Sequence, residues 1–173
     1  IIIQDLCIHL FKISIMENLK KWKIKFIFFS SILGGGWSSK LFQTVREYNS
    51  LCYYIYTVKD KLRGVLKIFS GIDYKDFDKV LELIKIEMKN ISKGNFSDEL
   101  LENVKKIYLS SLKGIEDYQD DLIGNFISDI YLNDDDLSLR REKIGKVSKK
   151  DLMELSKKIH MDTVYLLKGV DYE

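Results

Sequence analysis

The chain has 173 residues, of which 46% are hydrophobic and 12% aromatic, and this suits one globular domain with a single core. Its 28 basic and 26 acidic residues nearly balance, and a net charge of +2 gives no large field to attract nucleic acid or an anionic membrane surface. We therefore expect neither nucleic acid nor membrane as a partner.

No segment predicts secretion or membrane insertion. Residues 1–16 look loosely like the apolar part of a signal peptide, but charged residues interrupt them and no small-residue cleavage site follows. The longest stretch without Asp, Glu, Lys or Arg, residues 26–39, contains three glycines and is too short to cross a bilayer. Cys7 and Cys52 form no CxxC pair, and no secretory context favours a disulfide. We expect a cytoplasmic protein.

A strand and a helix are predicted first. Apolar residues alternate with others over residues 7–15, as in a strand buried on one face and partly on the other. The apolar stretch at 26–33 predicts the end of a helix whose start the sequence does not define. The glycines at 34–36 terminate this helix.

A short helix and a β-hairpin are predicted next. Ser38 and Ser39 are placed to cap a helix that continues to Glu47, because a hydroxyl oxygen there can accept a hydrogen bond from a first-turn amide. Residues 51–58 and 64–71 are rich in apolar and β-branched or aromatic residues, and a polar connection joins them. This pattern predicts two paired strands with a longer loop.

The rest of the chain is predicted to be mostly helical. Apolar residues recur at helical spacing from Phe77 to Ile91, and Gly94 ends that helix. Ser97 is placed to cap the following helix, whose first turn is acidic. Its predicted apolar face consists of Leu101, Val104, Tyr108 and Leu112.

Three more helices and a strand complete the chain. Helices are predicted over 118–131 and 137–144, and Ser148 with Asp151 forms a capping box for a helix that continues to Ile159. Residues 161–167 predict a final strand. The order of elements predicts one α/β domain over residues 1–173, with a mixed, largely antiparallel sheet and helices packed on it.

A zinc site is excluded by the residues themselves. His9 and His160 are the only histidines, and neither HExxH nor the inverted HxxEH occurs, so the pair of same-face histidines that would hold zinc is absent. Neither histidine has an obvious companion, and we interpret both as structural. Buried thiols are likewise a better interpretation of Cys7 and Cys52 than nucleophiles. We expect no metal or other cofactor in this chain.

The glycine-rich segment at 34–40 invites comparison with a phosphate-binding loop, since glycine amides can surround a phosphate and a lysine follows. The spacing does not fit. A Walker loop has four residues between its glycines and a Gly directly before its Lys, whereas Ser39 precedes Lys40 here. The end of one helix and the capped start of another explain these residues better.

Arg46 and Tyr53 are the candidate site residues. A guanidinium and a phenol can both donate hydrogen bonds to a peptide carbonyl whose oxygen becomes negative during attack. Arg46 ends a predicted helix and Tyr53 begins a predicted strand, so a turn between them can bring the two side chains to one edge of the sheet. The alternative is that Arg46 pairs with an acid such as Glu47 and Tyr53 lies in the core.

Four short motifs carry a resemblance to a known family. LeuGlyGlyGly at 33–36, SerSerLysLeuPhe at 38–42, ValArgGlu at 45–47 and SerLeuCysTyrTyr at 50–54 occur in the order and spacing of the pitrilysin, insulysin and mitochondrial processing peptidase family. Segments at 71–73, 94–99, 137–139 and 162–169 also look like the C-terminal domain of that family. The resemblance covers about residues 32–169, whereas residues 1–31 match loosely and Trp37 stands where a small or Pro-like residue is expected.

The resemblance implies a site shared between two domains. In that family an Arg and a Tyr seven residues later come from the C-terminal domain and reach toward a peptide bound at the zinc of another domain. Arg46 and Tyr53 match that spacing. By resemblance they would orient the scissile peptide and stabilise its tetrahedral intermediate, while a zinc-bearing homologous domain or subunit would supply the metal and the general base.

The resemblance is greatest to bacterial half-size subunits that carry the Arg and the Tyr but no zinc motif. Such a chain should not cleave peptides alone. Two alternatives remain open at this point: a non-catalytic interaction domain that stabilises a peptidase complex, and a decayed fragment of a longer protein.

Overall fold

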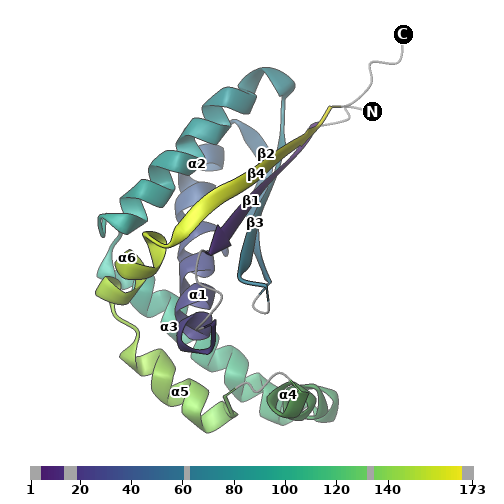
Figure 1. Ribbon diagram of the computed structural model, residues 1–173, viewed down its shortest axis with the longest axis vertical. Coiled ribbons are helices and arrows are strands. Elements are labelled where there is room, and N and C mark those ends of the chain that lie inside the picture. The colour runs from purple at the N-terminus through teal and green to yellow at the C-terminus, as the bar shows by residue number, and fades with distance from the viewer. Residues whose placement is uncertain (1–4, 14–18, 61–62, 132–134, 169–173) are drawn as a thin grey trace.

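The computed structural model describes residues 5–13, 19–60, 63–131 and 135–168 (Figure 1). Two short 3-10 turns lie at Tyr74–Asp76 and Ile115–Asp117. The main elements are β1 (Asp5–Ile13), α1 (Leu19–Gly34), a π-helix (Phe42–Tyr48), β2 (Cys52–Asp60), β3 (Val65–Ile72), α2 (Phe77–Ser92), α3 (Asp98–Gly114), α4 (Gln119–Tyr131), α5 (Leu137–Lys146), α6 (Lys149–Ser156) and β4 (Ile159–Leu167).

The four strands form one sheet in the order β2, β3, β1, β4, and each neighbouring pair is antiparallel. The first strand of the chain therefore lies inside the sheet, between the hairpin strand β3 and the last strand β4. The expected α/β fold with helices packed on a largely antiparallel sheet is confirmed. No parallel pair occurs among the described strands.

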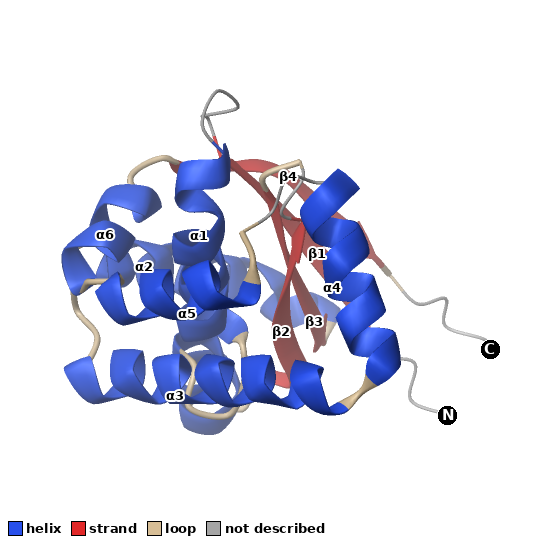
Figure 2. Ribbon diagram, turned by 90° about the horizontal axis from the view of Figure 1, so that it is seen from below, coloured by secondary structure: helices blue, strands red, loops and turns tan. Residues whose placement is uncertain are grey.

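Helices cover one face of the sheet (Figure 2). α1 lies against β2 and also contacts α3 and α6, while α2 packs on α6. Apolar residues near the C-terminal end of α1, among them Phe28, Phe29 and Ile32, are fully buried, as are Leu66 and Ile68 of β3. Burying such side chains is the main favourable contribution to folding.

The opposite face of the sheet carries aromatic side chains. Tyr56 on β2 stands opposite Phe69 on β3, and their rings stack with centroids 5.3 Å apart. Phe69 is opposite Ile8 of β1, and Ile8 is opposite Tyr165 of β4, so Tyr165 continues the same row. Both tyrosines are exposed, so β2 and β4 each present an aromatic side chain on the face that the main helical layer does not cover.

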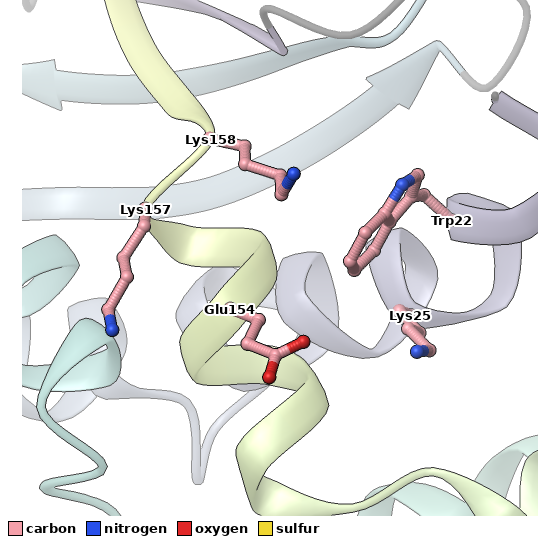
Figure 3. A pocket seen from close by; sticks show the side chains of 5 residues that line it. All are labelled: Trp22, Lys25, Glu154, Lys157 and Lys158. Carbon is pink, nitrogen blue, oxygen red and sulfur yellow. The ribbon is translucent and has the colours of Figure 1, made fainter. Parts of the chain in front are cut away.

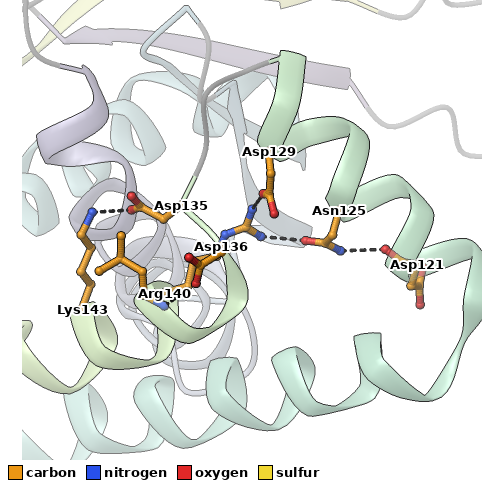
Figure 4. A network of polar contacts seen from close by, with 8 residues as sticks. Asp121, Asn125, Asp129, Asp135, Asp136, Arg140 and Lys143 are labelled. Carbon is orange, nitrogen blue, oxygen red and sulfur yellow. Dashed lines mark hydrogen bonds and ion pairs between the residues drawn. The ribbon is translucent and has the colours of Figure 1, made fainter.

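α4 stands apart from the main helical layer and is held to α5 by its polar edge (Figure 4). The buried guanidinium of Arg140 donates hydrogen bonds to Asn125 over 2.7 Å and to Asp129 over 2.6 Å. The apolar side of the helix is turned outward, and its exposed residues are Leu122, Ile123, Phe126, Ile127 and Ile130. The chain thus presents an apolar helix face that no described residue buries.

Several boundaries differ from the predicted ones. The last predicted helix ends at Ser156, not Ile159, because Ile159 already begins β4. The first strand runs from Asp5 to Ile13, and residues 14 and 15 of the predicted strand lie outside the described residues. Capping by Ser97 and the capping box of Ser148 and Asp151 are confirmed.

The predicted capping by Ser38 and Ser39 is wrong. The π-helix has Leu41 at its N-cap position and no side-chain cap hydrogen bond. The Ser39 hydroxyl instead donates to the carbonyl oxygen of Gly36 at 2.5 Å. This bond holds the turn after α1 closed.

Candidate functional site

Arg46 lies in the last turn of the π-helix, next to the buried Val45. π-helices are rare and occur frequently at functional sites. The Arg46 side chain is partly exposed, and its guanidinium carbon lies 4.8 Å from the centroid of the Phe42 ring, within range of a cation–π interaction. The helix thus presents a cation at the surface with an aromatic ring beside it.

The connection from Arg46 to the sheet is tightly closed. Ser50 has φ 52°, a left-handed conformation that is uncommon for residues other than glycine. Its amide donates to the carbonyl of Arg46, and the amide of Leu51 donates to that of Val45, both over 3.0 Å. These two bonds form a Schellman-type cap that is widened by one residue because the last turn is π-helical. The cap turns the chain directly into β2.

Tyr53 occupies a β-bulge at the start of β2. Cys52 pairs with Ile72 and Tyr54 with Gly71, so Tyr53 is the extra residue between two pairs. Bulges re-aim side chains and are common next to active sites. The Tyr53 side chain is 70% exposed, and its ring centroid lies 5.9 Å from the guanidinium carbon of Arg46.

The structure therefore brings the two candidate residues together. The alternative that Tyr53 belongs to the core is wrong, since most of its surface is exposed. Arg46 does approach Glu47, but the Nε to Oε1 distance is 4.0 Å and both side chains are exposed, so the pair contributes little. Among the described residues no hydrogen bond uses the guanidinium donors. The geometry leaves Arg46 and Tyr53 able to donate to a ligand, and their catalytic role stays a prediction.

Two hollows adjoin this pair. One, of about 300 Å³, is lined by Trp37, Phe42, Gln43, Arg46 and Glu47. The other, of about 250 Å³, lies beside Tyr53 and has Asp73 and Asp76 on its rim. The site is therefore an exposed, shallow surface with space on the Arg46 side and on the Tyr53 side.

Cys52 lies next to the site, and its thiol is not activated. Partial burial raises the pKa of the Cys52 thiol to about 11, although the positive charge of Arg46 acts in the opposite direction. A thiol with so high a pKa is almost entirely protonated near neutral pH. This agrees with the interpretation of Cys52 as structural.

The glycine-rich segment before the site has a packing role. α1 ends at Gly34, as predicted. A Cβ atom at Gly34 would lie 2.6 Å from Cγ2 of Thr57 and 3.2 Å from its backbone nitrogen, so only glycine permits this contact with β2. Thr57 Oγ1 donates to the carbonyl of Ser30 over 2.9 Å, which fixes the same contact. The glycines thus bring α1 close to the strand that carries Tyr53.

Sequence reasoning missed the buried support of the π-helix. Glu87 of α2 is only 4% exposed and accepts a hydrogen bond from Thr44 Oγ1 over 2.7 Å. Lys40 Nζ lies 3.2 Å from the other carboxylate oxygen. A signal was available, because Glu87 falls at helical spacing between Ile84 and Ile91, on the face that is buried.

The described residues do not fit a zinc site. No group of three or more His, Cys, Asp or Glu side chains within them could hold a metal ion. His160 is exposed at the start of β4 and pairs with Lys12, whereas His9 pairs with Val164, so the two histidines are not neighbours in the sheet. In the same part of the chain, no helix is long and apolar enough to span a bilayer.

A further hollow, of about 490 Å³, lies between α1 and the end of α6 (Figure 3). The ammonium groups of Lys25 and Lys158 lie 4.9 and 5.2 Å from the ring centroid of Trp22, which is 7% exposed. Lys25 is also paired with Asp151 at 2.5 Å. Lys25 and Lys158 are thus engaged with the indole, and Lys25 also with Asp151, so this hollow is not our candidate site.

Comparison with known proteins gives a family model. The model described as "Peptidase M16 inactive domain" matches residues 12–108, a range that contains both Arg46 and Tyr53. A curated relative, named "Probable inactive metalloprotease YmfF" of Bacillus subtilis (strain 168), is 28% identical over 150 residues. That match covers 83% of this chain and 34% of the relative, so this chain spans about a third of the relative's length.

Solved structures agree on the fold. A conserved protein from Enterococcus faecalis V583 superimposes on the whole chain with a TM-score of 0.90 at 23% identity, and 41% of that protein is covered. A peptidase M16 inactive domain from Pseudomonas fluorescens superimposes on 94% of this chain with a TM-score of 0.77 at 18% identity, and 40% of it is covered. At these identities the likeness concerns the fold alone.

Proposed function

The chain belongs to the family of the peptidase M16 inactive domain, and from this premise we propose that it is the non-zinc half of a peptidase, presenting Arg46 and Tyr53 to a bound peptide. The pitrilysin-type resemblance of its sequence and its fold agree with that family. The observation that carries the proposal is the approach of the Arg46 guanidinium to the Tyr53 ring at an exposed edge, 5.9 Å apart.

The two side chains suit a carbonyl group that gains negative charge. Arg46 offers several N–H donors and a fixed positive charge, and the phenol of Tyr53 offers one O–H donor. A peptide carbonyl oxygen placed between them would receive hydrogen bonds that strengthen as the oxygen becomes an oxyanion. The widened cap and the bulge fix the backbone from which both side chains extend.

The substrate of this proposal is an extended peptide. The hollows beside Arg46 and Tyr53 would receive side chains on the two sides of the carbonyl. A zinc-bearing homologous domain or subunit would supply the metal and the base, since this chain spans about two fifths of the two solved structures described above and its described residues contain no group of side chains that could hold a metal ion. The chain alone should therefore not hydrolyse peptides.

The test is peptide cleavage by the chain assembled with a zinc-bearing homologue from the same cell. We expect Arg46→Ala and Tyr53→Phe each to lower kcat by on the order of tenfold to a thousandfold, as for other donors to an oxyanion. Arg63→Ala and Tyr48→Phe are matched controls, because both side chains are exposed and lie outside the pair. An unchanged kcat in both Arg46→Ala and Tyr53→Phe would contradict the catalytic role.

A second candidate function is a non-catalytic interaction domain, and the outward apolar face of α4 favours it. Exposed apolar helix faces of this kind mark protein interaction sites. If association alone is the function, Phe126→Ser and Ile130→Ser should abolish complex formation while the Arg46 and Tyr53 variants keep full activity. Analytical ultracentrifugation of the mixed subunits, run beside the cleavage assay, separates the two functions.

A further inference from the structure

Four side chains form a continuous row that extends beyond the Arg46 and Tyr53 pair. The Trp37 and Phe42 rings are stacked, with centroids 6.5 Å apart and an interplanar angle of 11°. The guanidinium of Arg46 lies near Phe42 on one side of this series and near Tyr53 on the other. The proposed oxyanion donors are thus continuous with an aromatic surface.

Trp37 contributes almost nothing to the core. It is 83% exposed, although an indole is among the side chains that gain most from burial. Its indole ring contacts the ring of Phe42, which is itself only half-buried. A large ring presented in this way fits a binding role better than a structural one.

The backbone under Trp37 is held in place. Gln43 Nε2 donates to the carbonyl oxygen of Trp37 over 2.6 Å, which ties the turn to the π-helix. One residue earlier, the carbonyl of Gly36 accepts bonds from the amide of Ser39 at 3.0 Å and from its hydroxyl at 2.5 Å. The backbone that carries Trp37 is therefore held to the π-helix by the Gln43 bond, and the turn before it is closed by Ser39.

The hollow along this row has the size and chemistry for one side chain. Its volume of about 300 Å³ is at the lower end of the range for ligand pockets, too small for an extended ligand as a whole. It is lined by the aromatic residues Trp37 and Phe42 together with the polar residues Gln43, Arg46 and Glu47. A lining of aromatic and polar residues suits a large apolar side chain attached to a polar backbone.

We propose that Trp37 and Phe42 form a specificity subsite that takes an aromatic or large aliphatic side chain of the peptide, next to the carbonyl held by Arg46. This inference rests on the proposed function and adds the class of substrate. Arg46 lines the hollow and also belongs to the proposed oxyanion site. A peptide whose carbonyl binds Arg46 would therefore have a neighbouring side chain beside this hollow. The peptide backbone would run past Arg46, and the side chain would insert against the Trp37 indole.

The test uses two Ala- and Ser-rich peptides that differ only in a central Phe or Ala. Binding to the full chain is followed in NMR spectra through the indole N–H signals of Trp37 and Trp22 and the Arg46 Nε–H signal. We expect the Phe peptide to bind on the order of tenfold more tightly, because it buries one more aromatic side chain. It should shift the Trp37 signal and leave the buried Trp22 signal in place.

A variant separates this inference from the proposed function. Trp37→Ala should remove the preference for Phe while the Ala peptide still shifts the Arg46 signal. Tyr48→Trp, an exposed aromatic control at the end of the π-helix, should keep the preference. Equal binding of both peptides with a shifted Arg46 signal would overturn the subsite alone. If no peptide shifts either signal, both the subsite and the proposed peptide binding fail.

Discussion

Thr44 donates a 2.7 Å hydrogen bond to the buried carboxylate of Glu87, and this contact joins the helix of Arg46 to α2. Lys40 adds an ion pair to the same carboxylate from one turn earlier. Two residues of the site-bearing segment thus converge on one acidic group inside the molecule. Arg46 is exposed, but its position depends on this buried support.

Replacing Glu87 should therefore destabilise the fold. We expect Glu87→Ala to lower the free energy of unfolding by about 2 kcal/mol, because it leaves the Thr44 hydroxyl and the Lys40 ammonium without their acceptor. Urea denaturation measures the change. Glu82→Ala, at an exposed position of the same helix, is the control and should stay within about 0.5 kcal/mol of wild type. Equal effects of the two substitutions would show that the buried contact is not stabilising.

The left-handed residue between the π-helix and β2 gives a second prediction. Ser50→Val should lower the free energy of unfolding by about 1 to 2 kcal/mol, since a β-branched residue is strained at φ 52°. Ser50→Gly should be neutral or stabilise by up to about 1 kcal/mol. Thermal unfolding of both variants checks the order. Ser38→Val, at an exposed position without a positive φ, is the control, and a loss in Ser50→Gly as large as in Ser50→Val would contradict this account.

The reactivity of Cys52 gives a third prediction. Because burial raises its pKa to about 11, the thiolate fraction near pH 8 should be on the order of a hundredfold below that of an unperturbed cysteine. Iodoacetamide labelling in a Cys7→Ser background should thus be slow in the folded protein and should accelerate as pH rises toward 11. The same protein in urea provides the unperturbed rate. Fast labelling of the folded chain at pH 8 would contradict the burial of the thiol.

Asp151 gives the pH dependence of stability. Burial disfavours its charged form, but hydrogen bonds from Lys25 and Ser148 outweigh that effect and lower its pKa. A carboxyl group with a lowered pKa stabilises the folded state above the unfolded value of about 4, and this contribution is lost as pH falls through the folded pKa. Unfolding curves between about pH 2 and 6 should show this loss in wild type and a smaller one in Asp151→Asn. Glu82→Gln should follow the wild-type curve, and identical pH profiles for Asp151→Asn and wild type would be inconsistent with the assignment.

Much of the fold was predictable because local patterns and tertiary packing agree. The periodicity from Phe77 to Ile91, the cap at Ser97 and the capping box at Ser148 all appear in the structure as predicted. The proximity of Arg46 and Tyr53 was also predictable, since a short connection between a helix and a strand leaves little choice of direction. The sequence did not predict which backbone conformation the chain takes between the π-helix and β2.

Three features of this connection depend on backbone hydrogen bonds, which any residue type can make: the π-helical turn, the left-handed Ser50 and the bulge at Tyr53. The identity of the residues therefore does not predict them. Ser39 illustrates the same limit, because a serine before a helix has more than one possible hydrogen-bond partner, and here its hydroxyl donates to Gly36 and caps no first-turn amide. The outward apolar face of α4 could not be inferred either. Amphipathic periodicity predicts that one face is covered, and it does not name the molecule that covers it.

The position of β1 has a consequence for synthesis of the chain on the ribosome. β1 has β3 as one neighbour and β4 as the other, and β4 ends at Leu167, far along the sequence. Pairings between such distant segments form slowly, and an unpaired strand edge invites aggregation until they do. While residues 159–167 are still unmade, a nascent chain exposes one side of β1. The pairing of β1 on this side therefore has to wait until residues 159–167 have been synthesised, and β4 then takes its place as the edge strand.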